Sequence, residues 1–362
     1  MKKATNSALM RRKNEKLVLS MIYKAPISRV EIAKKTGLTK AAITFIVDDL
    51  MSRGILLETD GQSETVGRNP KMLSLNGDAF YVIGINITRH HVAVGIMNLA
   101  GKMVSSDYFS LCECNKTLAK IKHSVEEQMK TAKVPKEKIY KGAVVTPGPV
   151  DIENGMILNP PNFNEWHHFP IVSELTQLLG VPFVFENVSS ATALSEKLFG
   201  AAIGTENFLA LRVDEGIGSG IVLDDVLFRG PCELGHISIS YDGKPCECGN
   251  RGCMEKYAAI PAILDGTPYQ SWQEVVDADD ETLMKKEAEY LSCGIVSANN
   301  IFSFDKIVLC GDLSYRAGKL VSFVSDAVRN KMLTGKYPIV STGAVSSRHK
   351  IAAAVAIYDL IS

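Results

Sequence analysis

The chain has 362 residues, 46% of them apolar and 22% charged, and a formal net charge of zero. This length suits two or three compact cores, and no apolar run reaches the roughly 20 residues that a membrane-spanning helix needs. The basic N-terminus lacks the apolar stretch of a signal peptide, so we expect a cytoplasmic protein with no membrane partner. In that compartment the eight cysteines do not indicate a disulfide framework.

The charge is unevenly distributed along the chain. Residues 1–72 hold 14 Lys and Arg against 7 Asp and Glu, a net charge of +7, and the remainder holds 26 against 33, a net charge of −7. A basic block joined to an acidic body favours a polyanionic partner for the block. A solvated basic tail would have the same composition, so the pattern of apolar residues has to separate the two.

Two helices are predicted at the start of the basic block. Apolar residues at helical spacing over Asn14–Lys24 predict the first helix, which ends before Pro26. Its apolar stripe consists of Leu17, Val18, Met21 and Ile22. Ser28 and Glu31 have the spacing of a capping box, which predicts a short second helix that runs to Lys35.

A third helix follows a tight turn at Thr36 and Gly37. Thr39 is its predicted N-cap, and Gly54 ends it. Its apolar stripe consists of Ala42, Ile43, Ile46, Val47 and Leu50. Three short helices with a glycine turn between the second and the third indicate a helix-turn-helix.

In a helix-turn-helix the N-terminal end of this last helix enters the major groove of DNA. The side chains near that end that do not belong to the apolar stripe are Thr39, Lys40, Ala41 and Thr44. Lys40 can reach a phosphate or a guanine edge, and the small residues Ala41 and Thr44 can meet thymine methyl groups. These four residues are therefore the predicted DNA contacts of the helix.

Two short apolar segments after the third helix predict a β-hairpin. Ile55–Leu57 and Met72–Leu75 flank a polar loop, as in the wing of a winged helix. Within this loop Arg68 lies close to a glycine and a proline, where it can enter a narrow minor groove. A three-helix domain that docks onto a protein is the alternative, but the basic excess and the wing together favour DNA.

From Tyr81 onward strands alternate with helices, which predicts an α/β architecture. The predicted strands are Tyr81–Ile87, Val92–Met97, Ala143–Val145, Val181–Phe185, Phe208–Val213, Gly220–Leu223 and Ile307–Leu309. The predicted helices are Leu118–Lys130 and Ile171–Leu179. Asn76 and Gly77 mark the one obvious boundary, so we expect a DNA-binding domain over residues 1–77 and a second domain over residues 78–362.

Four metal-binding side chains lie within 18 residues of one another in the second domain. They are His236, Cys246, Cys248 and Cys253. This set suits a tetrahedral Zn²⁺ site, and four protein ligands leave no open position, so the predicted zinc is structural. Unrelated free thiols are the alternative, although glycines on both sides of Cys246–Cys248 supply the turns that let a short loop wrap an ion.

The residues around this cluster resemble the zinc-containing signature of the ROK family of repressors, open reading frames and kinases. The matching segments are Glu233–His236, Cys246–Glu255, Pro147–Asp151, Asn159–Phe163, Gly216–Gly220 and Cys310–Leu313. The resemblance covers essentially the whole second domain. The N-terminal winged helix is the one that the repressor branch of this family carries, of the xylose and N-acetylglucosamine type.

The resemblance implies a two-lobed actin-like fold of the ribonuclease H-like, sugar kinase type, with a lobe boundary near residue 190. It implies a sugar in the cleft, bound by Asn187, Glu233, His236 and Glu255. Carboxylates accept hydrogen bonds from hydroxyl groups, and an amide both donates and accepts hydrogen bonds. His236 would bind zinc through one ring nitrogen and a sugar hydroxyl through the other. Taken singly, Glu233 also suits an exposed carboxylate and Asn187 a turn former.

The sequence departs from the family kinases at the positions that carry catalysis. Where the kinases have an Asn-Asp pair with aspartate as general base, this chain has Asn187 and Val188, and valine takes no proton. Glu186 points to the opposite face of a strand and is a poor substitute. The first phosphate loop, Asn86–His90, lacks the glycine pair and the carboxylate of the kinases, although Asp214–Gly220 keeps its glycines. We therefore expect no phosphorylation of sugar by ATP.

The predicted function is a sugar-responsive repressor that binds double-stranded operator DNA as a homo-oligomer, a dimer or a tetramer. An active sugar kinase with an accessory DNA-binding domain is the main alternative. A protein partner acting on a vestigial cleft, and a zinc or redox sensor, are the others. Neither the sugar nor the operator follows from the sequence.

Overall fold

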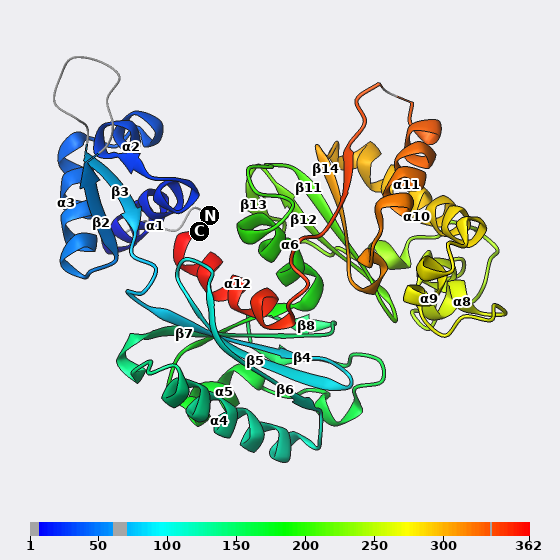
Figure 1. Cartoon of the computed structure of the whole chain (residues 1–362), viewed down its shortest axis with the longest axis horizontal. Coiled ribbons are helices and arrows are strands. Elements are labelled where there is room, and N and C mark those ends of the chain that lie inside the picture. Colours follow the sequence, from blue (N-terminus) through cyan, green and yellow to red (C-terminus); the bar gives the residue numbers. More distant parts are fainter. Residues whose placement is uncertain (1–6, 61–70, 334) are drawn as a thin grey trace. The chain divides into compact units, whose positions relative to one another are not determined.

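The computed structural model describes residues 7–60, 71–333 and 335–362 (Figure 1). The chain divides into two compact units, of which the first is Met1–Glu186 with Arg348–Ser362 and the second is Asn187–Ser347. The C-terminal helix therefore belongs to the first unit. These units do not test the boundary between residues 77 and 78, so the domains 1–77 and 78–362 stay a prediction.

The three predicted helices of the basic block are present, as α1 (Ser7–Lys24), α2 (Arg29–Thr36) and α3 (Lys40–Ser52). α1 begins seven residues before the predicted start. Its first described side chains, from Met10 to Lys13, are exposed and form no apolar stripe, so periodicity alone did not reveal them. The stripe of α1 also differs from the prediction, because Leu19 is buried while Leu17 is 36% exposed.

The predicted caps of the second and third helices are confirmed. Ser28 and Glu31 form the capping box of α2, which ends at Gly37 in the left-handed conformation with φ 71°. Thr39 Oγ1 accepts a hydrogen bond of 3.2 Å from the backbone of Ala42 at the start of α3. The buried residues of α3 are Ile43, Ile46, Val47 and Leu50, four of the five predicted, while Ala42 is only half-buried.

The wing is a three-stranded sheet with the order β1-β3-β2. β2 (Leu56–Asp60) and β3 (Lys71–Leu75) form the predicted hairpin, and β1 (Ile27–Ser28) pairs antiparallel with β3. A strand of two residues shows no periodicity, so β1 was not predicted. Arg68 lies outside the described residues.

The first unit contains a five-stranded sheet with the order β10-β7-β4-β5-β6. Its strands are β4 (Tyr81–Ile87), β5 (His91–Asn98), β6 (Met103–Ser110), β7 (Ile139–Thr146) and β10 (Phe183–Asn187). β10 begins two residues later than predicted, after Pro182, which has no N–H to donate to a sheet. A short hairpin of β8 (Val150–Asp151) and β9 (Met156–Ile157) follows β7.

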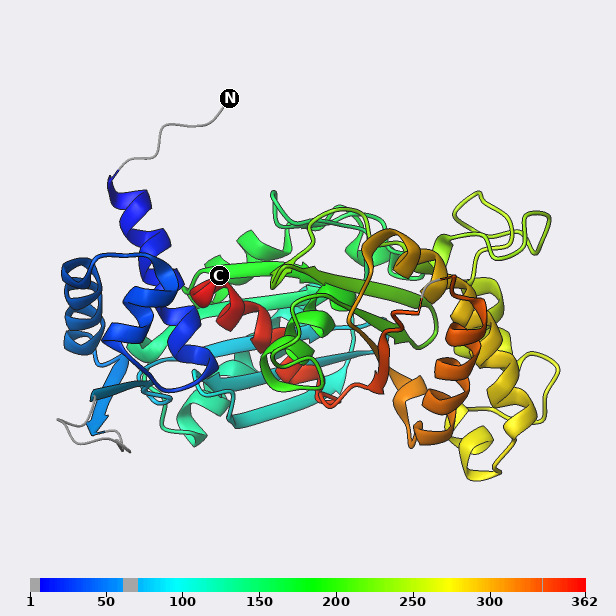
Figure 2. The same cartoon turned by 90° about the horizontal axis from the view of Figure 1, so that it is seen from above.

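Helices cover both faces of this sheet (Figure 1 and Figure 2). α4 (Cys114–Thr131) and α5 (Ile171–Leu179) pack on the face that carries the isoleucines of β4. α12 (Arg348–Ile361) packs on the other face, where Gly84 pairs with Gly95. A Cβ at Gly84 would lie 2.6 Å from the backbone nitrogen of Ala353, so only glycine allows this close approach.

The second unit contains a five-stranded sheet with the order β13-β12-β11-β14-β15, which corresponds to β6-β5-β4-β7-β10 of the first sheet. Its strands are β11 (Phe208–Val213), β12 (Ile217–Leu223), β13 (Val226–Leu227), β14 (Lys306–Cys310) and β15 (Ile339–Thr342). Its helices are α6 (Val188–Phe199), α7 (Glu255–Ala258), α8 (Ile260–Leu264), α9 (Trp272–Asp277), α10 (Glu281–Phe302) and α11 (Gly318–Lys331). In the first sheet β4–β5 and β5–β6 are antiparallel pairs and β4–β7 is a parallel pair. In the second sheet β11–β12 and β12–β13 are antiparallel pairs, and β11–β14 and β14–β15 are parallel pairs. The prediction of an α/β architecture is confirmed.

Short 3₁₀ helices complete the described elements. They are η1 (Lys136–Lys138), η2 (Asn164–Trp166), η3 (Leu234–His236) and η4 (Asp312–Ser314). Within the described ranges we find no helix that is long and apolar enough to cross a membrane.

Candidate functional site

The predicted metal ligands come together in the second unit. One ligand atom of each of the four residues, His236, Cys246, Cys248 and Cys253, lies within 4.8 Å of the other three. His236 Nδ1 is 3.6 Å from Cys246 Sγ, and Cys248 Sγ is 3.6 Å from Cys253 Sγ. Ligand atoms around a tetrahedral zinc are about 3.5–3.8 Å apart, given its usual bond lengths. The donor set and its spacing therefore fit Zn²⁺.

Glycine turns shape the loop that carries the thiols. Gly249 and Gly252 have φ of 89° and 70°, a conformation that favours glycine. At Gly252 a Cβ would lie 1.6 Å from the carbonyl oxygen of Ser240, so no other residue fits there. Without a metal, burial raises the pKa of the Cys253 thiol to about 12. A coordinated metal ion deprotonates such a thiol. The positive charge of the metal would then balance the negative charge of the thiolates.

His236 connects the metal cluster to the predicted sugar residues. Its Nδ1 atom faces the thiols, which leaves Nε2 as the ring nitrogen for a different partner. The backbone N–H of His236 donates to the carbonyl of Glu233 over 3.0 Å in η3. The N–H of Met254 donates to the carbonyl of Ile237 over 2.9 Å, which places the start of α7, and thus Glu255, beside η3.

Glu255 and Asn187 each bind the backbone at the start of a secondary-structure element, β12 and α6 respectively. Glu255 Oε2 accepts a hydrogen bond of 2.7 Å from the backbone of Ile217, the first residue of β12. Asn187 is the N-cap of α6, where its Oδ1 accepts from the backbone of Ser189 and of Ser190 over 3.0 and 2.9 Å. The turn-forming role considered for Asn187 is thus real. It leaves the sugar-binding role of Asn187 untested.

The glycines of the second loop allow β12 to pack on α6. A Cβ at Gly218 would lie 2.0 Å from Ser189 Oγ, and one at Gly220 would lie 2.6 Å from the carbonyl oxygen of Ser189. From the sequence, these glycines could belong to a phosphate-binding loop or could serve only a turn. Their observed environment is a strand–helix contact, and it places β12 between Glu255 and the start of α6.

The first loop is a closed hairpin turn. Thr88 Oγ1 accepts a hydrogen bond of 3.0 Å from the backbone of His91. Asn86 is 1% exposed, and its Nδ2 donates to the carbonyl of Arg348 at the start of α12 over 3.3 Å. Arg89 Nε donates to the carbonyl of Pro161 over 2.9 Å. Side chains of this loop thus bind other parts of the first unit.

The described DNA-contact candidates are all on the surface. Thr39 at the N-cap of α3 and Lys40, Ala41 and Thr44 on the helix are exposed. Phe45 on the same helix is also 58% exposed, and its ring centroid lies 4.9 Å from the guanidinium carbon of Arg11.

Two carboxylates of α3 are paired with arginines, one from α2 and one from the C-cap of α3 itself. Arg29 contacts Asp48 over 2.7 Å, and Arg53 contacts Asp49 over 3.2 Å. These pairs reduce the negative charge that α3 would bring to a phosphate backbone.

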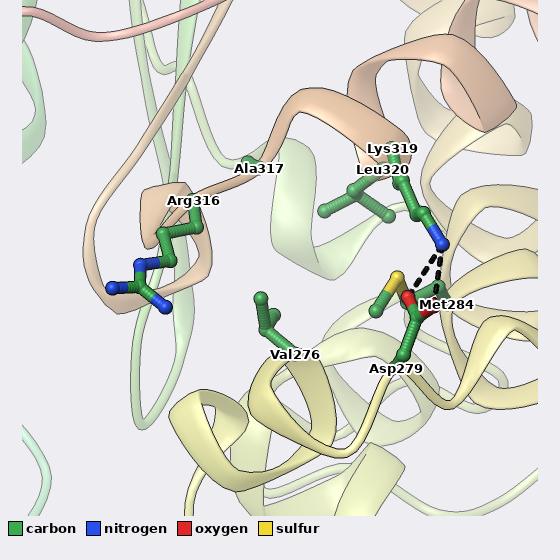
Figure 3. A pocket seen from close by; sticks show the side chains of 7 residues that line it. All are labelled: Val276, Asp279, Met284, Arg316, Ala317, Lys319 and Leu320. Atoms are coloured by element: carbon green, nitrogen blue, oxygen red, sulfur yellow. Dashed lines mark hydrogen bonds and ion pairs between the residues drawn. The ribbon is translucent and has the colours of Figure 1, made fainter.

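A separate small pocket lies at the start of α11 (Figure 3). Its volume is about 190 Å³, and none of the predicted sugar residues lines it. Lys319 points toward Asp279 and pairs with it over 2.6 Å, and it also contacts Glu281 over 3.0 Å. The pocket is smaller than the roughly 300 Å³ typical of ligand sites, and its lysine is already neutralised.

The comparisons with known proteins agree with this fold. A model of the ROK family matches residues 82–354, and the chain belongs to the ROK family. The xylose repressor of Bacillus subtilis (strain 168) is 30% identical over 325 residues, which cover 84% of this chain and 83% of that repressor. The DNA-binding transcriptional dual regulator NagC of Escherichia coli (strain K12) is 28% identical over 358 residues, which cover 91% of this chain and 87% of that regulator.

Two solved structures of ROK family proteins also match the chain. A ROK family transcriptional regulator, a homologue of the E. coli MLC protein, matches with a TM-score of 0.83 and 26% identity over 97% of this chain and 98% of that chain. The ROK hexokinase of Thermus thermophilus matches with a TM-score of 0.66 and 26% identity over 77% of this chain and 97% of that chain. These matches confirm the predicted α/β fold with the actin-like sheets of ROK repressors and sugar kinases, and the N-terminal winged helix-turn-helix stays a prediction.

Proposed function

We propose that this protein is a transcriptional repressor that responds to a sugar. The observation that carries the proposal is the combination of an exposed recognition helix with a sugar-kinase fold that has Val188 at the base position. Its relatives include proteins named xylose repressor and N-acetylglucosamine repressor. We assign residues 1–77 to DNA binding and residues 78–362 to effector binding and assembly.

The DNA surface of the proposed repressor is the N-terminal end of α3 together with the wing. Thr39, Lys40, Ala41 and Thr44 would face the major groove, and Arg68 the minor groove. A homo-oligomer, a dimer or a tetramer, would place two DNA-binding heads (residues 1–77 of each chain) on a palindromic operator. The spacing of the two half-sites would follow the symmetry of the protein.

The sugar would be a monosaccharide bound by Asn187, Glu233, His236 and Glu255. Two carboxylates, one amide and one imidazole nitrogen match the hydroxyl groups of such a ligand. A structural Zn²⁺ held by His236 and the three cysteines would fix the imidazole. Sugar binding would change the relation between the two units and weaken operator binding, by the free-energy difference of the sugar for the two states, typically about 1–3 kcal/mol.

The protein would not be a kinase. Val188 supplies no general base, and losing one costs on the order of 10²–10⁴ in rate. The side chains of the first loop bind elsewhere in the first unit, and Gly218 and Gly220 pack on α6. Both changes support a sensor in which recognition is kept and catalysis is absent.

The test is a selection of DNA from a random library with the full chain, followed by titration of the selected DNA with sugars. D-xylose, N-acetyl-D-glucosamine and D-glucose are the first probes. We expect enrichment of an inverted repeat and release by one of these sugars, with no ATP consumption in a coupled assay. Failure to enrich any sequence, or turnover of ATP with a sugar, would contradict the proposal.

A further inference from the structure

The chain passes between its two units twice, and α6 lies at both passages. The first passage follows Glu186, and α6 begins at Val188. The second passage follows Ser347 and leads directly into α12 at Arg348.

Glu196 fastens the segment before the second passage to α6. Its side chain is fully buried, and Oε2 accepts hydrogen bonds of 2.7 and 3.0 Å from the backbone of Ala201 and Ala344. Oε1 accepts a third bond, of 2.8 Å, from the backbone of Val345. A Cβ at Gly343 would lie 2.8 Å from Oε1, so the chain approaches the carboxylate as closely as glycine allows. Burying a carboxylate is costly unless such bonds compensate it.

The other end of α6 contacts the candidate sugar site. Asn187 caps the helix, and β12 packs on its first turn through Gly218 and Gly220. β12 begins at Ile217, whose backbone is bound by Glu255. One continuous set of contacts within the second unit therefore runs from Glu255, through β12 and α6, to Glu196 and residues 344–345.

α12 lies between the sheet of the first unit and α1, and it contacts both. It packs against β4 at Gly84 with no space for a Cβ, so the helix and the strand are in close backbone contact. Near its C-terminal end Asp359 forms an ion pair with Lys141 of β7. The charge of Asp359 also acts on Lys16 of α1, and α12 and α1 are in contact.

We propose that Glu196 is a positioning residue that couples sugar binding to the DNA-binding head. A sugar that moves Glu255 or Asn187 would displace β12 and α6, and Glu196 would transfer that displacement to residues 344–345 and so to α12 and α1. This inference rests on the proposed function, and it concerns how the same sugar site is read out.

The central variant is Glu196→Gln. A glutamine has one acceptor oxygen, and its NH₂ group would face a backbone N–H, so the three bonds cannot all persist. Glu196→Asp is the second variant, because it keeps the charge but shortens the reach. Ser195→Ala is the matched control: Ser195 is equally buried on the same helix, and its hydroxyl donates within the helix to the carbonyl of Thr192.

The experiment measures three affinities for each full-length protein: for D-xylose or N-acetyl-D-glucosamine, for the selected DNA, and for that DNA with saturating sugar. We expect Glu196→Gln and Glu196→Asp to bind sugar and DNA separately within about threefold of wild type, while the effect of sugar on DNA affinity falls from about 5–150-fold toward one. Ser195→Ala should keep the full effect. A purely structural role would lower the melting temperature without removing the effect of sugar.

Amide hydrogen exchange provides a readout that needs no ligand. Loss of the Glu196 bonds should accelerate exchange about tenfold or more in residues 343–347 and in α12 and α1, and Ser195→Ala should not. Unchanged exchange in α12 and α1, or a wild-type sugar response in Glu196→Gln, would overturn the inference alone. A wild-type protein that binds DNA but responds to no sugar would overturn the proposed function and this inference with it.

Discussion

The backbone N–H of Ile217 donates a hydrogen bond of 2.7 Å to Oε2 of Glu255. One carboxylate oxygen of Glu255, a proposed sugar-binding residue, is thus already bonded to the first residue of β12. A sugar hydroxyl that binds this carboxylate would share it with, or take it from, the strand. In the proposed sugar site, Glu255 would therefore link sugar recognition to the position of β12.

Replacing Glu255 by Gln tests this link. A hydrogen bond to a charged group contributes about 1.5–3 kcal/mol, so we expect sugar affinity to fall at least tenfold while DNA affinity stays near that of wild type. Calorimetry and DNA-binding anisotropy measure the two. Glu247→Gln is the control, because Glu247 is an exposed carboxylate that pairs with Lys256 over 2.9 Å. Normal release from DNA by sugar in Glu255→Gln would refute the assignment.

The cysteine cluster predicts about one zinc per chain in the purified protein. Elemental analysis should find it, and Cys253→Ser should lose it, because a hydroxyl is a weak ligand for zinc. Chelation should lower the melting temperature by several degrees, since a structural metal contributes its binding free energy to folding. Cys293→Ser, which changes a half-buried thiol on α10, should have little effect on the metal content. A metal-free wild type that is equally stable would contradict this assignment.

Val188→Asp tests the proposal that the protein is not a kinase. The substitution places a carboxylate at the first position of α6, but the loop of Asn86 remains a closed turn bound to α12. We expect no detectable ATP consumption with D-xylose, D-glucose or N-acetyl-D-glucosamine in a coupled assay. Measurable turnover would show that the base position alone had silenced the enzyme.

Lys40→Ala tests the recognition helix. Removing one phosphate contact should weaken binding to all DNA sequences and reduce the slope of log affinity against log salt by about one. If Lys40 reads a guanine instead, affinity should fall by about 1–3 kcal/mol for the selected site only. Lys116→Ala, which removes an exposed lysine from α4, is the control. A variant with unchanged affinity and salt slope would remove Lys40 from the interface.

Glu287 predicts a pH dependence of stability. It is fully buried on α10, both carboxylate oxygens lack a hydrogen-bond partner within the described ranges, and burial raises its pKa well above the usual value. Its unfolded pKa is near 4.5, so the native state retains a proton that the unfolded state loses, and stability falls as pH rises above that value. Glu287→Gln should therefore raise the melting temperature at pH 8 and change it less at pH 5. An equal change at both pH values would contradict this account.

Local patterns were sufficient to predict the head and the metal cluster. The capping residues Ser28 and Thr39 act on the next three residues of the chain, and the four metal ligands lie within one 18-residue segment. The sugar residues could be proposed only from family resemblance, because Asn187 and Glu255 are far apart in sequence and share no local pattern.

Contacts between distant segments could not be predicted. Glu196 binds residues that lie 148 and 149 positions further along the chain. Its burial is invisible in sequence because a single glutamate on a helix normally indicates an exposed face. The pairing of Gly84 with Gly95 under α12 likewise depends on sheet register, which apolar alternation does not fix for glycines.

The central claim is most directly tested by measuring the coupling between sugar and DNA in both directions. The affinity of the wild-type protein for the selected DNA is measured with and without saturating sugar, and the affinity for that sugar is measured with and without DNA. We predict the same factor in both measurements, between about 5-fold and 150-fold, with sugar weakening DNA binding. A sugar that binds the protein tightly and leaves its DNA affinity unchanged would contradict the account.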